Sequence, residues 1–226
     1  MVTTLRRHLD LLLLAALAAV LVAFPALDLA VSGAFYDPAQ GFWLKTHPLA
    51  RFIYDLVPWI SRAVLASLIL FLLGGWVFYR RHAAFIRRRR AALFLLLVAL
   101  VGPLLLVNGV FKEHWGRARP SQVVEFGGTK QFTRAAVPTD QCARNCSFVS
   151  GHASVGFYFL ALAFVWPRRR MLWLALGTGA GLLIGLVRIV QGGHFLSDVL
   201  FAGIVVYLTA RGLAALMHPA DVESRA

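Results

Sequence analysis

RIVQGGHFLSDVLFAGIVVYLTARGLAALM, residues 188–217, is the stretch that decides the fold. From about residue 195 it is apolar and long enough to cross a membrane as one helix, because a span needs roughly 20 such residues. Arg188, His194 and Asp198 lie at the edge of this apolar run. Ionisable groups are costly next to a bilayer, so the stretch predicts a transmembrane helix with a functional site at one end.

The rest of the sequence has the same character. Apolar residues make up 59% of the 226 residues and charged residues 15%, whereas about a quarter of a soluble domain is charged. We therefore predict an all-α fold, in which a single domain over residues 1–226 forms an integral membrane bundle of six transmembrane helices. The six apolar stretches lie at about 9–30, 57–79, 91–110, 152–167, 171–187 and 195–217.

Lys and Arg residues favour one orientation of this bundle. With six alternating spans, thirteen of them fall on one side, mostly in dense runs such as Arg87–Arg90 and Arg168–Arg170, and ten fall on the other. Three of those ten, Lys112, Arg119 and Arg188, belong to polar clusters. Because cytoplasmic loops are rich in basic residues, we predict that both termini are cytoplasmic and that the clusters face outward. The net charge of +13 then requires no nucleic acid partner.

The first apolar stretch has two interpretations. Basic residues precede Leu11–Val22 and small residues follow it, which is typical of a cleaved signal peptide. Its length, and the lack of a small-x-small cleavage site before Pro25, favour a retained transmembrane helix instead.

Two longer polar stretches, roughly 31–56 and 111–149, are predicted external loops. The first mixes aromatic and polar residues without a clear period, and is either an anchor at the membrane interface or a lateral route for a lipid. The second contains Cys142 and Cys146, which form a disulfide or remain free thiols in an oxidising compartment. Two cysteines alone make a poor zinc site.

The cluster at residues 188–198 pairs a histidine with a carboxylate. His194 and Asp198 are four residues apart and share one face if a helix begins here. A carboxylate that accepts from one imidazole N–H fixes the tautomer and leaves the other nitrogen free as a nucleophile. The alternative is a histidine at a helix start, with an aspartate that only favours the helix dipole.

A second cluster, Ser150-Gly151-His152, immediately precedes the fourth apolar stretch. A helix start offers backbone N–H groups to an anion, and a glycine allows that anion to approach closely. The Ser150 hydroxyl can donate as well, and His152 can act as a general acid. The alternative is a serine N-cap beside an interfacial histidine.

The cluster KEHWGRARP, residues 112–120, holds Lys112 and Arg119 on either side of a short polar turn. Phosphate recognition uses the forked donors of arginine and the point charge of lysine. By itself, such a segment beside a membrane is typical of contact with lipid headgroups.

Together the three clusters have a spacing that resembles the signature of the type 2 phosphatidic acid phosphatase superfamily. The motifs are Lys112-x6-Arg119-Pro120, Ser150-Gly151-His152 and Arg188-x5-His194-x3-Asp198. The superfamily includes membrane lipid phosphate phosphatases and soluble vanadium haloperoxidases. Val149 and Val187 stand where the family usually has Pro and Ser, which affects the expected geometry of the phosphate loops and hence rate and substrate preference.

The resemblance implies a role for each motif residue. His194 would attack phosphorus to form a phosphohistidine, Asp198 would orient it, and His152 would protonate the leaving oxygen. The groups that would neutralise the phosphate, without a metal ion or other cofactor, are Lys112, Arg119, Arg188, Ser150 and the Gly151 amide. Arg117 and His114 lie within the first motif as candidate substrate contacts, with a plain solvated loop residue as the alternative for Arg117.

These expectations describe a metal-independent phosphoric monoester hydrolase in the bacterial inner membrane, multi-pass, with a periplasmic active site. Candidate substrates are phosphatidic acid, phosphatidylglycerophosphate, undecaprenyl pyrophosphate and lipid A, with a slight preference for lipid A because Arg117, Arg134 and Arg144 lie in the long loop. One alternative is a phosphotransferase that passes the phosphoryl group to a second lipid. Another is an anion transporter, which would place ionisable groups near the midplane. Nothing in the sequence fixes an oligomeric state.

Overall fold

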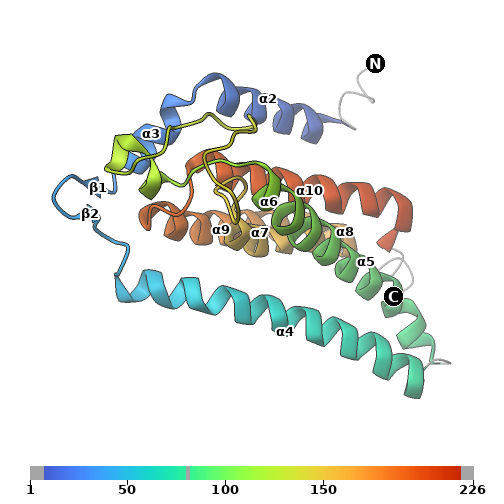
Figure 1. Cartoon of the computed structure of the whole chain (residues 1–226). Helices are drawn as coiled ribbons and strands as arrows, with labels where there is room; N and C mark the ends of the chain where they lie inside the picture. The colour runs from blue at the N-terminus through green and yellow to red at the C-terminus, as the bar shows by residue number, and fades with distance from the viewer. Residues whose placement is uncertain (1–7, 80–81, 220–226) are drawn as a thin grey trace.

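The computed structural model describes residues 8–79 and 82–219. Its helices form a bundle, and the two short antiparallel strands lie at one end of it (Figure 1). The main elements are α2 (Leu9–Ala23), α3 (Ala26–Gly33), β1 (Tyr36–Asp37), β2 (Gly41–Phe42), α4 (Pro48–Tyr79), α5 (Ala83–Ala99), the π-helical η1 (Leu100–Phe111), α6 (Lys112–His114), α7 (Gly151–Phe157), the 3-10 helix η4 (Tyr158–Ala161), α8 (Leu162–Val165), α9 (Arg170–Val190) and α10 (Leu196–Met217).

Four helical segments in the described ranges are long and apolar enough to cross a membrane: Pro48–Phe78, Arg88–His114, Pro167–Val190 and Leu196–Met217. The helices α2 and α3 meet at an angle of 79° and together make a fifth span if they are counted as one. The predicted all-α membrane class is therefore confirmed. Six spans remain a prediction, because the fourth apolar stretch is shorter than expected.

That stretch forms α7, η4 and α8, which cover Gly151–Val165. Fifteen helical residues reach only about 22 Å, less than the roughly 30 Å of a hydrocarbon core. Most of its side chains are buried by neighbouring helices. Glycines allow α9 to pack closely on it, since a Cβ at Gly156 would lie 2.7 Å from the Ala180 carbonyl oxygen and a Cβ at Gly181 only 2.4 Å from Phe157. This helix is surrounded by protein more than by lipid.

The expected loop at 31–56 is shorter than predicted, because α3 extends to Gly33 and α4 begins at Pro48. Proline is well suited to the first turn of a helix, where its missing N–H costs nothing. The first turns of α4 carry Arg51 and Asp55, whose polarity hid the helix from a search for apolar runs. Residues 48–56 are thus part of a rigid element.

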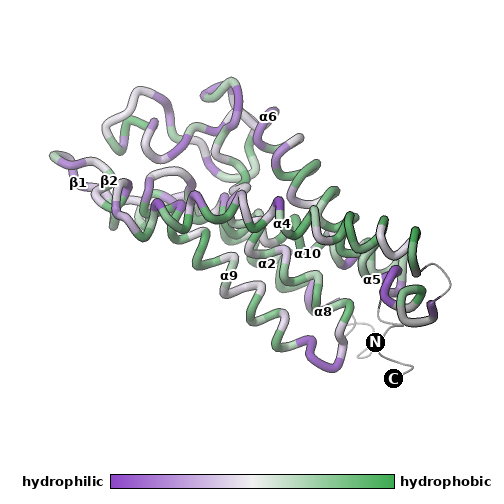
Figure 2. Tube along the Cα trace, turned by 90° about the horizontal axis from the view of Figure 1, so that it is seen from below, coloured by the Kyte–Doolittle hydropathy of each residue, from purple (hydrophilic) through white to green (hydrophobic). Residues whose placement is uncertain are grey.

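Figure 1 shows the start of α2, the end of α10 and the turn from α4 to α5 at the same end of the bundle. The strands and the long segment after α6 lie at the opposite end, and Figure 2 shows that this segment is markedly more hydrophilic than the helices. Arg168–Arg170 also lie away from the polar clusters. Five of the thirteen basic residues used in the orientation argument lie outside the described residues: Arg6, Arg7, Arg80, Arg81 and Arg225.

Candidate active site

The three polar clusters meet at one end of the bundle through the segment that precedes α7. The Ser150 amide donates to the Asp198 carbonyl at 3.0 Å, and the Ser147 amide donates to the Arg117 carbonyl at 2.8 Å. The Cys146 amide donates to the Lys112 carbonyl at 2.9 Å. Backbone hydrogen bonds therefore tie the first and third clusters to the second, although 86 residues separate Lys112 from Asp198 in the sequence.

His194 is 1% exposed and sits between α9 and α10. Its Nδ1 lies 2.7 Å from the Ser147 carbonyl oxygen but 3.7 Å from Oδ2 of Asp198. A carbonyl can only accept, so Nδ1 carries the proton and Nε2 keeps its lone pair. The sequence predicted a direct hydrogen bond from His194 to Asp198. In the structure the Ser147 carbonyl is the closer partner of Nδ1. Burial lowers the pKa of His194 to about 3, which outweighs the opposing influence of Asp198 and keeps the ring neutral near pH 7.

Asp198 lies in the first turn of α10 and is fully buried. Its Oδ2 accepts from the Ser147 hydroxyl at 2.5 Å and from the Phe195 amide at 2.8 Å, and its Oδ1 pairs with Nη1 of Arg117. The carboxylate thus orients His194 largely through Ser147, whose carbonyl is the closest partner of the imidazole Nδ1. Because all these partners are donors, they hold Asp198 in its charged form.

Arg117 is fully buried, so both sequence interpretations of this residue, substrate contact and solvated loop residue, are wrong. Its Nη2 lies 2.8 Å from Oδ2 of Asp28, which is on α3, while Nη1 pairs with Asp198. Its Cζ also lies 4.4 Å from the centre of the Phe195 ring. Burial alone would lower the pKa of Arg117, but Asp198 and Asp28 outweigh it and raise that pKa. The other candidate contact, His114, is exposed at the end of α6 and is not among the residues that line the cavity described below.

Asn145 anchors two of the predicted phosphate-binding cations. Its Oδ1 accepts from Nζ of Lys112 at 2.9 Å, and its carbonyl accepts from Nη2 of Arg119 at 2.7 Å. Cys142 and Cys146 form a disulfide, which decides between the two alternatives left by the sequence. Asn145 lies within the short loop that this disulfide closes. The motif search missed Asn145, because its role depends on a contact 33 residues away in the sequence.

Tyr54 on α4 organises the other two motif side chains. Its ring stacks on His152 with centroids 4.4 Å apart, and Cζ of Arg188 lies 4.5 Å from its centroid. In the part of the chain that the structure describes, neither Nε2 of His152 nor Nε of Arg188 has a hydrogen-bond partner. Both are buried polar atoms that lack a partner, which a bound ligand would supply. Ser150 serves as the N-cap of α7, where its hydroxyl accepts from the Ala153 amide at 3.4 Å.

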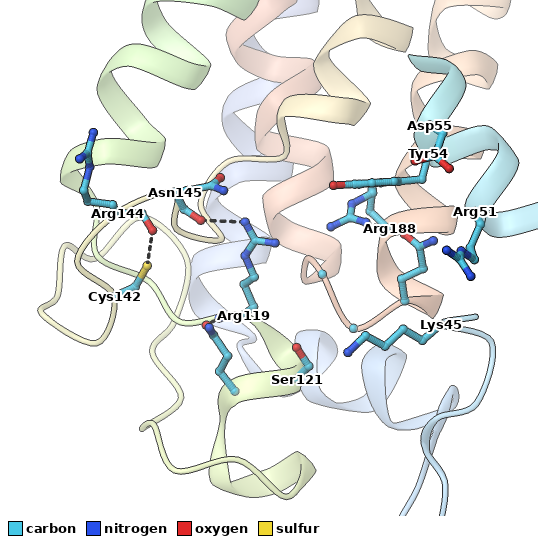
Figure 3. A pocket seen from close by; sticks show the side chains of 14 residues that line it. Lys45, Arg51, Tyr54, Asp55, Arg119, Ser121, Cys142, Arg144, Asn145 and Arg188 are labelled. Atoms are coloured by element: carbon cyan, nitrogen blue, oxygen red, sulfur yellow. Dashed lines mark hydrogen bonds between the residues drawn. The ribbon is translucent and has the colours of Figure 1, made fainter. Parts of the chain in front are cut away.

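A cavity of about 620 Å³ opens at this end of the bundle (Figure 3). Its wall carries five cationic side chains and a single carboxylate, Asp55. The cations are Lys45, Arg51, Arg119, Arg144 and Arg188. Within residues 8–79 and 82–219, no three His, Cys, Asp or Glu side chains gather in a group that could hold a metal ion. The excess of cationic over acidic side chains in its wall suits the cavity to an anion such as a phosphate.

Comparison with known proteins agrees with this geometry. The family model of the PAP2 superfamily matches residues 91–220, a range that contains all three clusters. The chain belongs to the PAP2 superfamily. The resemblance found from the spacing of the three motifs is thereby confirmed, and with it a membrane lipid phosphatase of the PAP2 type.

Two relatives cover most of the chain, and a third covers about half of it. It is 38% identical over 211 residues to a lipid A 4'-phosphatase of Francisella tularensis subsp. novicida (strain U112), which spans 86% of this chain and 88% of the relative. A lipid A 4'-phosphatase of Rhizobium etli is 33% identical over 219 residues, or 89% of this chain and 83% of the relative. A lipid A 1-phosphatase of Rhizobium etli is 34% identical over 110 residues, covering 46% of this chain and 44% of the relative. No solved structure gave a significant match.

Proposed function

We propose that the protein hydrolyses the 4'-phosphate monoester of lipid A at the periplasmic face of a bacterial inner membrane. The observation that carries this proposal is a strongly cationic cavity beside a buried, neutral histidine. The similarity to lipid A 4'-phosphatases over most of both chains supports the choice of lipid. The proposed topology has six spans, with α7, η4 and α8 as the fourth, both termini in the cytoplasm and the cavity outside.

In the first chemical step, Nε2 of His194 attacks phosphorus and forms a P–N bond as the P–O bond to the sugar breaks. The Ser147 carbonyl accepts a hydrogen bond from Nδ1–H, which stabilises the positive charge that develops on the ring. His152, whose Nε2 has no partner among the described residues, donates a proton to the leaving sugar oxygen. The products of this step are a phosphohistidine and a free hydroxyl on the lipid.

In the second step, water attacks the phosphohistidine while His152 accepts a proton from it. The P–N bond breaks, and inorganic phosphate leaves with His194 restored. Throughout, Lys112, Arg119 and Arg188 face the phosphate oxygens, where negative charge spreads in the transition state. The Ser150 hydroxyl and the Gly151 amide add donors at the start of α7. In this scheme the cations take the place of a metal ion.

The surroundings of the cavity suit a lipid substrate. Phe52 and Trp59 on α4 are 62% and 67% exposed. They lie on the same helix as Arg51 and Asp55, which line the cavity. An apolar groove between α4, η1 and α7 reaches Asn108, whose Oδ1 would lie 2.7 Å from a Cβ at Gly151. Acyl chains can therefore remain beside α4 while the phosphorylated headgroup enters the cavity. This favours the lateral route over the simple interface anchor for the segment at 31–56.

Phosphate release from lipid A tests the proposal directly. Purified protein in detergent with EDTA is expected to release one phosphate per lipid A, and His194→Ala is expected to release none. Mass spectrometry after mild acid, which removes the glycosidic 1-phosphate, identifies the site: a product that loses its remaining phosphate in acid had been cut at the 4'-position. Release only of the 1-phosphate would refute the proposed position. Transfer of phosphate to a second lipid without release would refute hydrolysis.

A further inference from the structure

Three cations in the cavity come from outside the three motifs. One of them, Arg144, pairs with Glu113 at 3.3 Å, and the other two are Lys45 and Arg51. Lys45 lies in the connection from β2 to α4, and Arg51 lies in the first turns of α4. Figure 3 shows both side chains directed toward the cavity from the α4 side. Both also lie outside residues 91–220, the range that matches the PAP2 family model. Their presence in the cavity is therefore a property of this chain that the shared motifs do not explain.

Their bonding differs from that of the motif cations. Arg119 and Lys112 are hydrogen-bonded to Asn145, and Arg188 to Gln191. Among the residues that the structure describes, the side chains of Lys45 and Arg51 have no hydrogen-bond or ion-pair partner. The nearby Asp55, four residues after Arg51 on α4, forms no ion pair with either. Two positive charges thus face the cavity uncompensated, which attracts a further anion.

The cavity is larger than one phosphate group needs. Its volume of about 620 Å³ lies within the roughly 300–1,000 Å³ typical of sites for whole small ligands. The names of the relatives, lipid A 4'-phosphatase and lipid A 1-phosphatase, indicate that lipid A is phosphorylated at two positions. A substrate with two phosphates would present one to His194 and leave the other in need of its own cations.

We propose that Lys45 and Arg51 form a second anion subsite, which binds another phosphate group of the same lipid while the first is hydrolysed. This inference rests on the proposed function and adds to it that the preferred substrate is a bisphosphorylated glycolipid. Arginine supplies forked donors to phosphate oxygens, and lysine supplies a compact charge. Loss of one such contact is expected to weaken binding about tenfold.

Two forms of lipid A provide the test. Mild acid converts lipid A into a monophosphorylated form that retains only the 4'-phosphate, and kcat and KM are measured for both lipids in mixed micelles. The wild type is expected to prefer the bisphosphorylated lipid about tenfold in kcat/KM. Lys45→Ala and Arg51→Ala are expected to reduce this preference to near parity by raising KM for the bisphosphorylated lipid. The charge-retaining Lys45→Arg is expected to restore most of it.

The matched control is Arg62→Ala, which removes an exposed cation from α4, the helix that carries Arg51, at a position outside the cavity. It is expected to keep the wild-type preference. An unchanged preference in Lys45→Ala and Arg51→Ala would overturn the subsite. Equal losses of kcat/KM on both lipids would also overturn it, because they would place these cations at the reacting phosphate. Binding of the two lipids to the inactive His194→Ala variant gives the same comparison without turnover, so failure of the proposed hydrolysis is distinguished from failure of the subsite.

Discussion

The buried ion network around Arg117 and the open cavity beside it use arginine in opposite ways. Arg117 is enclosed, and two carboxylates, Asp28 and Asp198, fix its guanidinium. Arg51 faces an open cavity and has no such partner within the described residues. The first arrangement holds His194, the proposed nucleophile, in place, and the second leaves positive charge available to the proposed substrate. Burial and pairing, and not residue type, therefore separate positioning from binding.

The largest effect is expected where the buried network is broken. Arg117→Ala leaves Asp28 and Asp198 as neighbouring buried carboxylates without their shared cation. Removing one partner of a buried pair costs about 3–5 kcal/mol, so the variant is expected to unfold at markedly lower temperature and to lose activity. Thermal unfolding in detergent, followed by circular dichroism, measures this. If Arg117→Ala were as stable as the wild type, the network would not be the structural support described here.

The next effect concerns acid. The folded-state pKa of His194 is lowered to about 3 by burial, below its ordinary value of about 6.5. The folded protein therefore binds this proton less readily than the unfolded chain, and the resulting stability is present above pH 6.5 and lost as pH falls toward 3. We expect His194→Asn, which keeps a donor toward Ser147, to lose less stability than the wild type over that range. The control is His114→Asn at an exposed histidine; an equal acid dependence in all three proteins would contradict the prediction.

A smaller effect is expected at the far end of the network. Arg117 and the Ser197 amide donate to different oxygens of Asp28, so Asp28→Asn keeps an acceptor for one of them and removes the charge. We expect a loss of about 1–3 kcal/mol in stability and a fall in kcat with little change in KM, because Asp28 is buried and does not line the cavity. A rise in KM alone would instead place Asp28 near the substrate. Asp37→Asn, at an exposed turn, is the control.

The smallest effect is expected at the rim of the cavity. Replacing both Cys142 and Cys146 by Ser opens the short loop that carries Asn145, and for a loop of this length the expected loss is up to about 2 kcal/mol. Because Asn145 anchors Lys112 and Arg119, KM is expected to rise several-fold with kcat less affected. Steady-state kinetics with and without the disulfide measures this change. A larger effect on kcat than on KM would mean that the loop acts on the chemical step.

The comparison of the two regions also explains what the sequence could predict. Motif spacing identified His194, His152 and the proposed phosphate-binding cations, because these residues lie in short, recognisable clusters. Only part of the buried network could be predicted from the sequence. Asp28 and Arg117 are 89 residues apart, and their pairing exists only in the folded chain. A signal for Asp28 was nevertheless present, as a carboxylate within an apolar stretch is costly and indicates a partner.

Helix boundaries were limited in a similar way. Apolar runs located α9 and α10 well, but they missed the first turns of α4, where polar residues face the cavity. Apolar runs also predicted a transmembrane span at 152–167, because hydropathy does not distinguish contact with lipid from contact with other helices. Tyr54 and Lys45 were therefore not recognised as part of the site, although both lie within the predicted loop at 31–56.

The enclosure of α7 by other helices has a mechanical consequence. A bilayer that becomes thicker or thinner acts first on helices that contact acyl chains, which respond by tilting or bending. Such helices include α4, whose side chains are largely exposed, whereas α7 is mostly enclosed by its neighbours. The depth at which Ser150 and His152 would meet the proposed phosphate is then fixed by the protein, independently of the thickness of the surrounding membrane.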